Sequence, residues 1–381
     1  MRTRRAVIAI VPVMLAVVCM QSGSAEAQGN ASVPLTLELN KESPEALAAA
    51  TVAYWTPERL ASAQPMLPQV DEIAVTAEAA TASTAIGKPV SASGRAPTAY
   101  VKPDWTNRLY DPAMSQIKPK AGGIEPQDVG SFGAHFTSAR VNPTGLETIY
   151  PNRAIGKLFF QDTAGSNFVC SAATLQRRIV LTAGHCVHSG SGGIEGFYRK
   201  FLFVPAFRNG VAPLGTFAPR VVGATSQWVT GGGNVPNAAD FGMFEMRDKA
   251  GKNIGNITGY LGFQTQSLLN NHTTKLGYPC NLDACAKMQQ VTSQAFRATS
   301  PNNVEYGSNA GGGSSGGPWV MNFGVQPVGG LFSSQNLIVG VTSYGYVSDL
   351  PLVQGSSIPD SQPGGFVELF NAMCAGRVGN C

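Results

Sequence analysis

The chain has 381 residues, of which 13% are charged, 43% are hydrophobic and 44 are glycine. Its formal net charge is +4, and residues 1–27 supply +2 of it (three arginines against Glu26). The net charge of +2 that remains for residues 28–381 is too small for a protein that binds nucleic acid electrostatically. The low charge and the abundant glycine favour a loop-rich β protein over a helical one.

The N-terminus has the features of an export signal. Residues 1–5 carry three arginines, the apolar run 6–20 follows, and 25–27 read Ala-Glu-Ala, a small-x-small cleavage site. We therefore expect a signal peptide over residues 1–27. The apolar run of 15 residues is short for a membrane-spanning helix, which needs roughly 20. We expect a secreted protein, extracellular or periplasmic, that leaves the membrane once the signal is removed.

Residues 28–141 contain no cysteine and are biased toward small side chains: within 71–100, 16 of 30 residues are Ala, Thr or Ser. Such a composition buries too little apolar surface for a large core, and it predicts a loosely structured pro-segment or linker. The aromatic patches 52–55 and 104–110 could dock on the domain that follows, as a segment that blocks an active site must do. A plain spacer is the alternative.

From residue 142 to 381 the pattern changes to short apolar runs separated by Gly, Pro and Asn turns, which predicts an all-β sandwich or barrel. The runs are 154–160, 179–182, 201–204, 240–244 and 337–342. About 240 residues suffice for two packed barrels. At the end, an apolar stripe of Phe366, Leu369, Phe370 and Met373 predicts one C-terminal helix.

Six cysteines remain once Cys19 leaves with the signal, and an even number in an exported chain indicates disulfides. The spacing favours three local pairs. They are Cys170 with Cys186, Cys280 with Cys285, and Cys374 with Cys381. The rival interpretation of 280–285 is half of a metal site, but no second Cys/His pair accompanies it, so we expect no metal.

Residues 311–319 read Gly-Gly-Gly-Ser-Ser-Gly-Gly-Pro-Trp. A serine flanked by glycines can occupy a tight turn with its hydroxyl exposed and backbone N–H groups free to bind an oxyanion, which makes Ser315 a candidate nucleophile. The same composition also suits a flexible linker, so a base is needed elsewhere. Of the four histidines, His185 directly follows a strand-like run and precedes Cys186, whose pairing would fix the imidazole as a general base requires.

Here the sequence resembles the trypsin-like (chymotrypsin-fold) serine peptidases. Their histidine motif Thr-Ala-Gly-His-Cys is matched at 182–186, and their Gly-Asp-Ser-Gly-Gly-Pro appears as Gly-Ser-Ser-Gly-Gly-Pro at 313–318. Segments 149–158, 203–210 and 276–279 make it most similar to the bacterial secreted glutamyl endopeptidase-like group. The resemblance implies two six-stranded antiparallel β-barrels with a short C-terminal helix, over a peptidase domain at 142–381. It also implies a monomer that acts on protein or peptide substrates without a cofactor.

The third member of such a site is a carboxylate that lies between the histidine and the serine in sequence and orients the imidazole. Asp240 heads an apolar run, as the family's aspartate does. Its rivals are Asp248, in a polar turn, and Asp283, inside the short loop between two cysteines. We predict His185 as base, Asp240 as orienting acid and Ser315 as nucleophile, with the N–H groups of Gly313 and Ser315 as the oxyanion hole.

The pattern Gly-x-Ser-x-Gly around Ser315 also fits the nucleophile elbow of α/β-hydrolases, which would indicate a lipase or esterase. That fold places its histidine after the serine, and no histidine follows Ser315. Ser314 stands where trypsin-type enzymes have an aspartate that captures a newly freed N-terminus. The glutamyl endopeptidase-like enzymes also do without it, and we expect pro-segment cleavage somewhere within 120–150.

The resemblance assigns the specificity pocket to Asn309 and to residues 342–345, namely Thr342, Ser343, Tyr344 and Gly345. A preference for Arg or Lys would need an aspartate at 309, and a preference for Glu would need a histidine at 342. Neither is present, so a neutral pocket for uncharged side chains is predicted. Two other function classes stay open: a catalytically silent binding module on the same fold, and an envelope or interaction protein built around 28–141.

Overall fold

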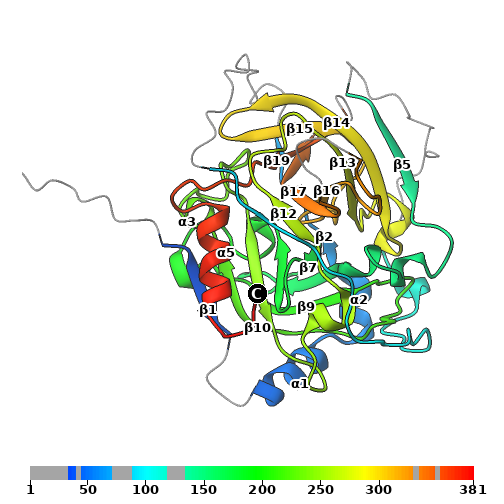
Figure 1. Cartoon of the computed structure of the whole chain (residues 1–381). Coiled ribbons are helices and arrows are strands. Elements are labelled where there is room, and N and C mark those ends of the chain that lie inside the picture. Colours follow the sequence, from blue (N-terminus) through cyan, green and yellow to red (C-terminus); the bar gives the residue numbers. More distant parts are fainter. Residues whose placement is uncertain (1–32, 40–43, 71–87, 118–133, 329–333, 348–351) are drawn as a thin grey trace, which may run out of the picture. The chain divides into compact units, whose positions relative to one another are not determined.

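The structure is a computed structural model, and it describes residues 33–39, 44–70, 88–117, 134–328, 334–347 and 352–381 (Figure 1). The predicted signal peptide lies outside the described residues, as does the part of the predicted cleavage region that spans 120–133. Within the described ranges no helix combines the length and the apolar character needed to cross a bilayer.

The first sheet has eight strands, ordered β1-β10-β11-β8-β7-β6-β9, with β2 paired to β7. These strands are β1 (Leu35–Glu38), β2 (Gln64–Pro65), β6 (Ile155–Gln161), β7 (Asn167–Thr174), β8 (Ile179–Thr182), β9 (Arg199–Pro205), β10 (Pro219–Ala224) and β11 (Gly242–Met246). All of its pairings are antiparallel except that of β2 with β7.

The second sheet has eleven strands, ordered β3-β18-β19-β15-β14-β13-β16-β17-β12-β4, with β5 paired to β14. These strands are β3 (Gln69–Val70), β4 (Ser91–Ala92), β5 (Phe136–Arg140), β12 (Gly262–Gln264), β13 (His272–Gly277), β14 (Gln289–Thr299), β15 (Asn303–Gly307), β16 (Pro318–Met321), β17 (Leu337–Val341), β18 (Tyr344–Tyr346) and β19 (Val353–Ser357). Two of its pairings are parallel, β12 with β17 and β3 with β18.

The all-β class and the C-terminal helix are confirmed, and each predicted apolar run contributes to a strand. The strand numbers differ from six and six. The first sheet owes β1 and β2 to the segment 28–141, and its other six strands come from the region after residue 142. The second sheet takes β3, β4 and β5 from the same segment. Strands are added because the sheet edges offer unpaired backbone groups to a neighbouring extended chain.

The segment 28–141 has little regular structure, as its composition predicts, but its described parts dock on the sheets. It contains α1 (Pro44–Tyr54) and α2 (Pro57–Ser62), and Trp55 between them is 5% exposed. The Trp55 indole donates a 2.6 Å hydrogen bond to the Lys200 carbonyl, and its ring packs on Phe159. The second aromatic patch docks through Tyr110, which is buried and stacks on Phe207.

The remaining α-helices of the described residues are short. They are α3 (Ser226–Val229), α4 (Ile254–Thr258) and α5 (Phe366–Ala375). Helix α5 lies beside β10 (Figure 1) and buries Phe366, Leu369 and Met373, three members of the predicted apolar stripe. The rings of Phe366 and Phe370 both pack on Phe263 of β12. Helix α5 therefore contacts the first sheet through β10 and the second sheet through Phe263 of β12.

Candidate active site

His185 sits in a single 3-10 turn, Gly184–Cys186, that directly follows β8. The preceding glycine is required there, because a Cβ at residue 184 would lie 2.7 Å from Trp228 Cγ and 2.9 Å from Asp240 Oδ1. On the other side Cys186 forms a disulfide with Cys170 of β7. The tight turn and the disulfide together fix the backbone that carries the imidazole.

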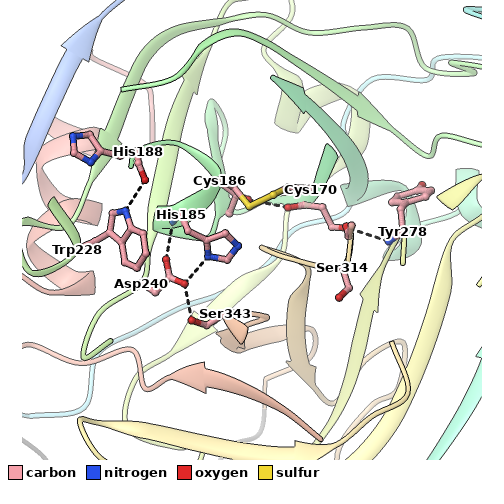
Figure 2. The surroundings of a disulfide bond; sticks show 12 residues. Cys170, His185, Cys186, His188, Trp228, Asp240, Tyr278, Ser314 and Ser343 are labelled. Carbon is pink, nitrogen blue, oxygen red and sulfur yellow. Dashed lines mark hydrogen bonds and ion pairs between the residues drawn. A yellow bond between two sulfur atoms is a disulfide. The ribbon is translucent and has the colours of Figure 1, made fainter. Parts of the chain in front are cut away.

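Asp240 lies two residues before β11 and is fully buried. Its Oδ2 is 2.7 Å from His185 Nδ1, and its Oδ1 accepts a 2.8 Å hydrogen bond from the His185 backbone N–H. A third donor, the Ser343 hydroxyl, lies 2.6 Å from Oδ2. Figure 2 shows these three contacts, with the other ring nitrogen of His185 pointing away from Asp240. The carboxylate therefore holds His185 at two points, its ring and its main chain, and is itself held by Ser343.

The two rival carboxylates are engaged elsewhere. Asp248 forms an ion pair with Arg178 at 2.7 Å, and Asp283 forms one with Arg140 at 2.5 Å. The hydrogen bond from Arg178 lowers the pKa of the Asp248 carboxyl group. At Asp283 burial is the largest influence and raises the pKa, but the hydrogen bonds from Arg140 and Gln289 together with the nearby positive charges outweigh it, so the pKa is lowered. The remaining histidines are separate from Asp240 as well. His188 accepts from Gly190 N–H and contacts the Gly193 carbonyl, while His135 and His272 are exposed.

Ser315 occupies the turn before β16, and its carbonyl accepts a 2.7 Å hydrogen bond from the N–H of Ser171. Ser171 directly follows Cys170, and Cys186, the disulfide partner of Cys170, directly follows His185. This hydrogen bond and this disulfide therefore connect the turn that carries Ser315 to the turn that carries His185. Ser315 Oγ and His185 Nε2 are both buried, and neither has a hydrogen-bond partner among the described residues. The Ser315 hydroxyl and the second ring nitrogen of His185 are thus each without a partner in the described structure.

A neutral hydrogen-bond network supports the residue before Ser315. The Ser314 hydroxyl donates to the Gly311 carbonyl at 2.6 Å and accepts from the Gln354 side-chain amide at 2.8 Å. Gln354 also donates to the Ala310 carbonyl at 2.8 Å and accepts from the Ser308 hydroxyl at 2.9 Å. No local pattern marks Gln354, because the pairing of β19 with β15 and β18 brings it to this turn.

Gly313 adopts a φ of +92°, and a Cβ there would lie 2.6 Å from the Tyr278 carbonyl, so this turn needs glycine. Its N–H is one of the two predicted oxyanion donors. In the structure this N–H donates a 2.9 Å hydrogen bond to the carbonyl of Met66, a residue of the docked N-terminal segment. The sequence analysis did not identify Met66, since nothing local marks a residue that lies more than 200 positions from its partner.

The predicted pocket residues divide into two sets. The Thr342 hydroxyl accepts from the Trp319 indole at 2.9 Å, Ser343 binds Asp240, and the Tyr344 hydroxyl donates to Glu305 at 3.0 Å. These three side chains are therefore committed to partners inside the protein. The other two predicted pocket residues are Asn309 and Gly345. Asn309 Oδ1 is buried without a partner among the described residues, and the Cα of Gly345 faces the side chain of Leu67.

The three disulfides are those that the spacing predicted: Cys170–Cys186, Cys280–Cys285 and Cys374–Cys381. Within the described part of the chain, one group of side chains is close enough to share a metal ion, and it consists of Cys170, His185 and Cys186. The two sulfurs of this group are bonded to each other, so they offer no thiolate to a metal.

No family model matches this sequence. It is similar to glutamyl endopeptidase of Bacillus licheniformis, with 30% identity over 206 residues, which cover 53% of this chain and 58% of that protein. It is also similar to a Bacillus subtilis protein named extracellular metalloprotease, with 23% identity over 46% of this chain and 54% of that protein. The chain thus spans little more than half the length of the curated relatives it matches. The first of these similarities confirms the resemblance to glutamyl endopeptidase.

Among solved structures, the protease Anisep from Arthrobacter nicotinovorans is 28% identical to this chain. The alignment covers 59% of this chain and 96% of Anisep, with a TM-score of 0.49. The thermostable serine protease AL20 is 26% identical, over 58% of this chain and 96% of AL20, also with a TM-score of 0.49.

Proposed function

We propose that this chain is a secreted serine endopeptidase in which Ser315, His185 and Asp240 form a catalytic triad. The observation that carries the proposal is the geometry at His185: Nδ1 is held by a buried carboxylate, while Nε2 is buried and unpaired within the described structure, as is the Ser315 hydroxyl. An oriented imidazole with an unpaired nitrogen can act as a general base, and an unpaired serine hydroxyl can act as the nucleophile. The similarity to glutamyl endopeptidase and the two motifs support the same assignment.

The reaction follows from these positions. His185 Nε2 takes the proton of Ser315 as Oγ forms a bond to the carbonyl carbon of the substrate, and Asp240 stabilises the imidazolium that results. The oxyanion is bound by the backbone N–H groups of Gly313 and Ser315. The imidazolium then gives its proton to the leaving amine, which departs and leaves an ester on Ser315. A water molecule, deprotonated by the same nitrogen, hydrolyses the ester and restores the free hydroxyl.

The preferred substrate has an uncharged side chain before the cleaved bond. Asn309 and Thr342 carry no charge, and Gln354 adds a neutral amide beside Ser314. A charged side chain entering such a site would lose its hydration without gaining an opposite charge, which is costly. The disulfides and the N-terminal sequence fit a protein that is exported before it acts.

The test is hydrolysis of a chromogenic peptide library by the wild-type protein and by three variants, Ser315→Ala, His185→Ala and Asp240→Asn. We expect Ser315→Ala and His185→Ala to abolish measurable turnover and Asp240→Asn to reduce kcat by about 10⁴-fold. Ser166→Ala, which removes an exposed hydroxyl between β6 and β7, should retain turnover. Equal hydrolysis by wild type and Ser315→Ala would refute the proposed nucleophile. A protein that binds peptides without cleaving them would instead be a silent binding module.

A further inference from the structure

Residues 64–70, here called the groove segment, cross the candidate active site from one sheet to the other. At its start β2 pairs in parallel with β7, which places Gln64 opposite Phe168 and Pro65 opposite Val169. At its end β3 pairs in parallel with β18, which places Gln69 opposite Gly345 and Val70 opposite Tyr346. The segment therefore joins the strand that carries Cys170 to the strand that follows Ser343.

The middle of the groove segment contacts the serine turn. The Met66 carbonyl accepts the 2.9 Å hydrogen bond from Gly313 N–H, and the Met66 N–H donates to the Val169 carbonyl at 3.1 Å. Two residues later the Pro68 carbonyl accepts from Gly345 N–H, also at 3.1 Å. Main-chain groups on both sides of Ser315 are thus occupied by a peptide of the same chain, as they are when an extended ligand adds to a sheet edge.

Side chains of the groove segment take up space beside two glycines. A Cβ at Gly345 would lie 3.0 Å from Leu67 Cδ2, and a Cβ at Gly312 would lie 3.0 Å from Pro65 Cβ. Leu67 therefore rests on the predicted pocket residue Gly345, and its apolar side chain agrees with a pocket for uncharged groups. Since the segment is covalently attached, its effective concentration at the groove is on the order of millimolar, so modest contacts suffice to keep it bound.

We infer that the groove segment is an inhibitor built into the chain, which occupies the substrate groove and the Gly313 oxyanion donor until it is displaced. The inference rests on the proposed function of the site. Its chain direction also opposes cleavage of the bond between Met66 and Leu67. The residues before Met66 pair with β7, and the Cys170–Cys186 disulfide connects β7 to the turn of His185. The residues after Leu67 pair with β18, so the amine of Leu67, which would leave on cleavage, belongs to the part of the segment on β18. The amine that must receive the proton is thus on the side away from the base.

The inhibitor role is tested with the full chain in two forms that release the groove segment. In one form, Leu67→Asp puts a charge on the side chain that contacts Gly345. In the other, residues 64–70 are replaced by seven Gly and Ser residues. The matched control is Val52→Asp, which makes the same kind of change on α1, where Val52 is 49% exposed. We expect both released forms to hydrolyse a short chromogenic peptide at least tenfold faster than wild type, and Val52→Asp to equal wild type.

A second measurement reports docking without catalysis. In a Ser315→Ala background, hydrogen exchange of peptides covering 312–317 and 344–347 should speed up when either release change is added and stay unchanged with Val52→Asp. Unchanged exchange in both released forms would overturn the docking. Equal hydrolysis by wild type and released forms would overturn the inhibition, provided that Ser315→Ala is inactive. Faster exchange without hydrolysis in any form would refute the proposed catalysis and the inhibitor role with it, while the docking would stand. Cleavage between Met66 and Leu67 that depends on Ser315 would show a substrate rather than an inhibitor.

Discussion

The side-chain amide of Gln354 donates a 2.8 Å hydrogen bond to the hydroxyl of Ser314, the residue that directly precedes the proposed nucleophile. Ser314 stands where trypsin-type enzymes carry an aspartate that pairs with a new N-terminus. Here two neutral side chains hold the turn, and they do so in a chain whose N-terminal segment is still attached. The turn before Ser315 therefore has these supporting hydrogen bonds in the uncleaved chain.

Gln354 should act as a positioning residue for that turn. Gln354→Ala removes the support of Ser314 and of the Ala310 carbonyl, so the Gly313 N–H loses its fixed direction. Because loss of one oxyanion-hole donor costs about 10²–10³ in kcat, we expect a partial loss of about tenfold in kcat with little change in KM. The matched control is Gln264→Ala, a buried glutamine of β12. A fall confined to thermal stability, with kcat unchanged, would contradict the positioning role.

Ser343 should orient Asp240. Its hydroxyl lies 2.6 Å from Asp240 Oδ2, the same oxygen that contacts His185 Nδ1. Ser343→Ala leaves the buried carboxylate with one donor fewer, and we expect kcat to fall by about tenfold, which is 1.4 kcal/mol of transition-state stabilisation. Ser343→Thr keeps a hydroxyl and should recover most of the activity. Ser356→Ala, on the neighbouring strand β19, is the control for loss of a buried serine. Equal kcat values for Ser343→Ala and Ser356→Ala would exclude a special role.

Lys157 should make the stability of the protein depend on pH. It is buried, its ammonium nitrogen lies 3.2 Å from the Cys285 carbonyl, and burial lowers its pKa to about 7. An unfolded lysine has a pKa of about 10.4, so between pH 7 and 10 the unfolded chain binds more protons than the folded one. The free energy of unfolding should therefore rise with pH in this window, by up to about 1.4 kcal/mol per pH unit from this group.

Denaturant unfolding between about pH 7.5 and 9, in steps of about half a pH unit, measures this slope for wild type and Lys157→Met. The variant should show a smaller slope. Some slope should persist, because burial also lowers the pKa of Lys275 well below its usual value. Lys102→Met, at an exposed position, should keep the wild-type slope. If Lys157→Met keeps it too, the buried lysine is not the source of the pH dependence.

The sequence was sufficient where chemistry is encoded locally. The motif around His185 and the short cysteine spacings each lie within a few residues. The structure shows His185 in contact with the predicted Asp240 and contains the three predicted disulfides, while the role of Ser315 stays a prediction. The apolar runs likewise predicted the strands, because burial on both faces of a sheet leaves a continuous hydrophobic stretch.

The remaining features depend on tertiary pairing. Gln354 reaches Ser314 because β19 pairs with β15 and β18, and Ser343 reaches Asp240 across 103 positions of sequence. Met66 lies in a segment whose composition predicts loose structure, and its contact with Gly313 depends on main-chain groups that every residue carries. No side-chain pattern records such a contact, so the groove segment could not be predicted from the sequence.

Labelling by a fluorophosphonate probe, followed by peptide mapping, tests the proposed catalysis most directly. The probe forms a covalent bond only with a serine hydroxyl that an adjacent base activates. It is applied to the wild-type chain and to the chain with residues 64–70 replaced, each with and without Ser315→Ala. The account predicts a single adduct on Ser315, faster in the replaced chain and absent from both Ser315→Ala forms. No adduct in the replaced chain, or an adduct that persists in Ser315→Ala, would contradict it.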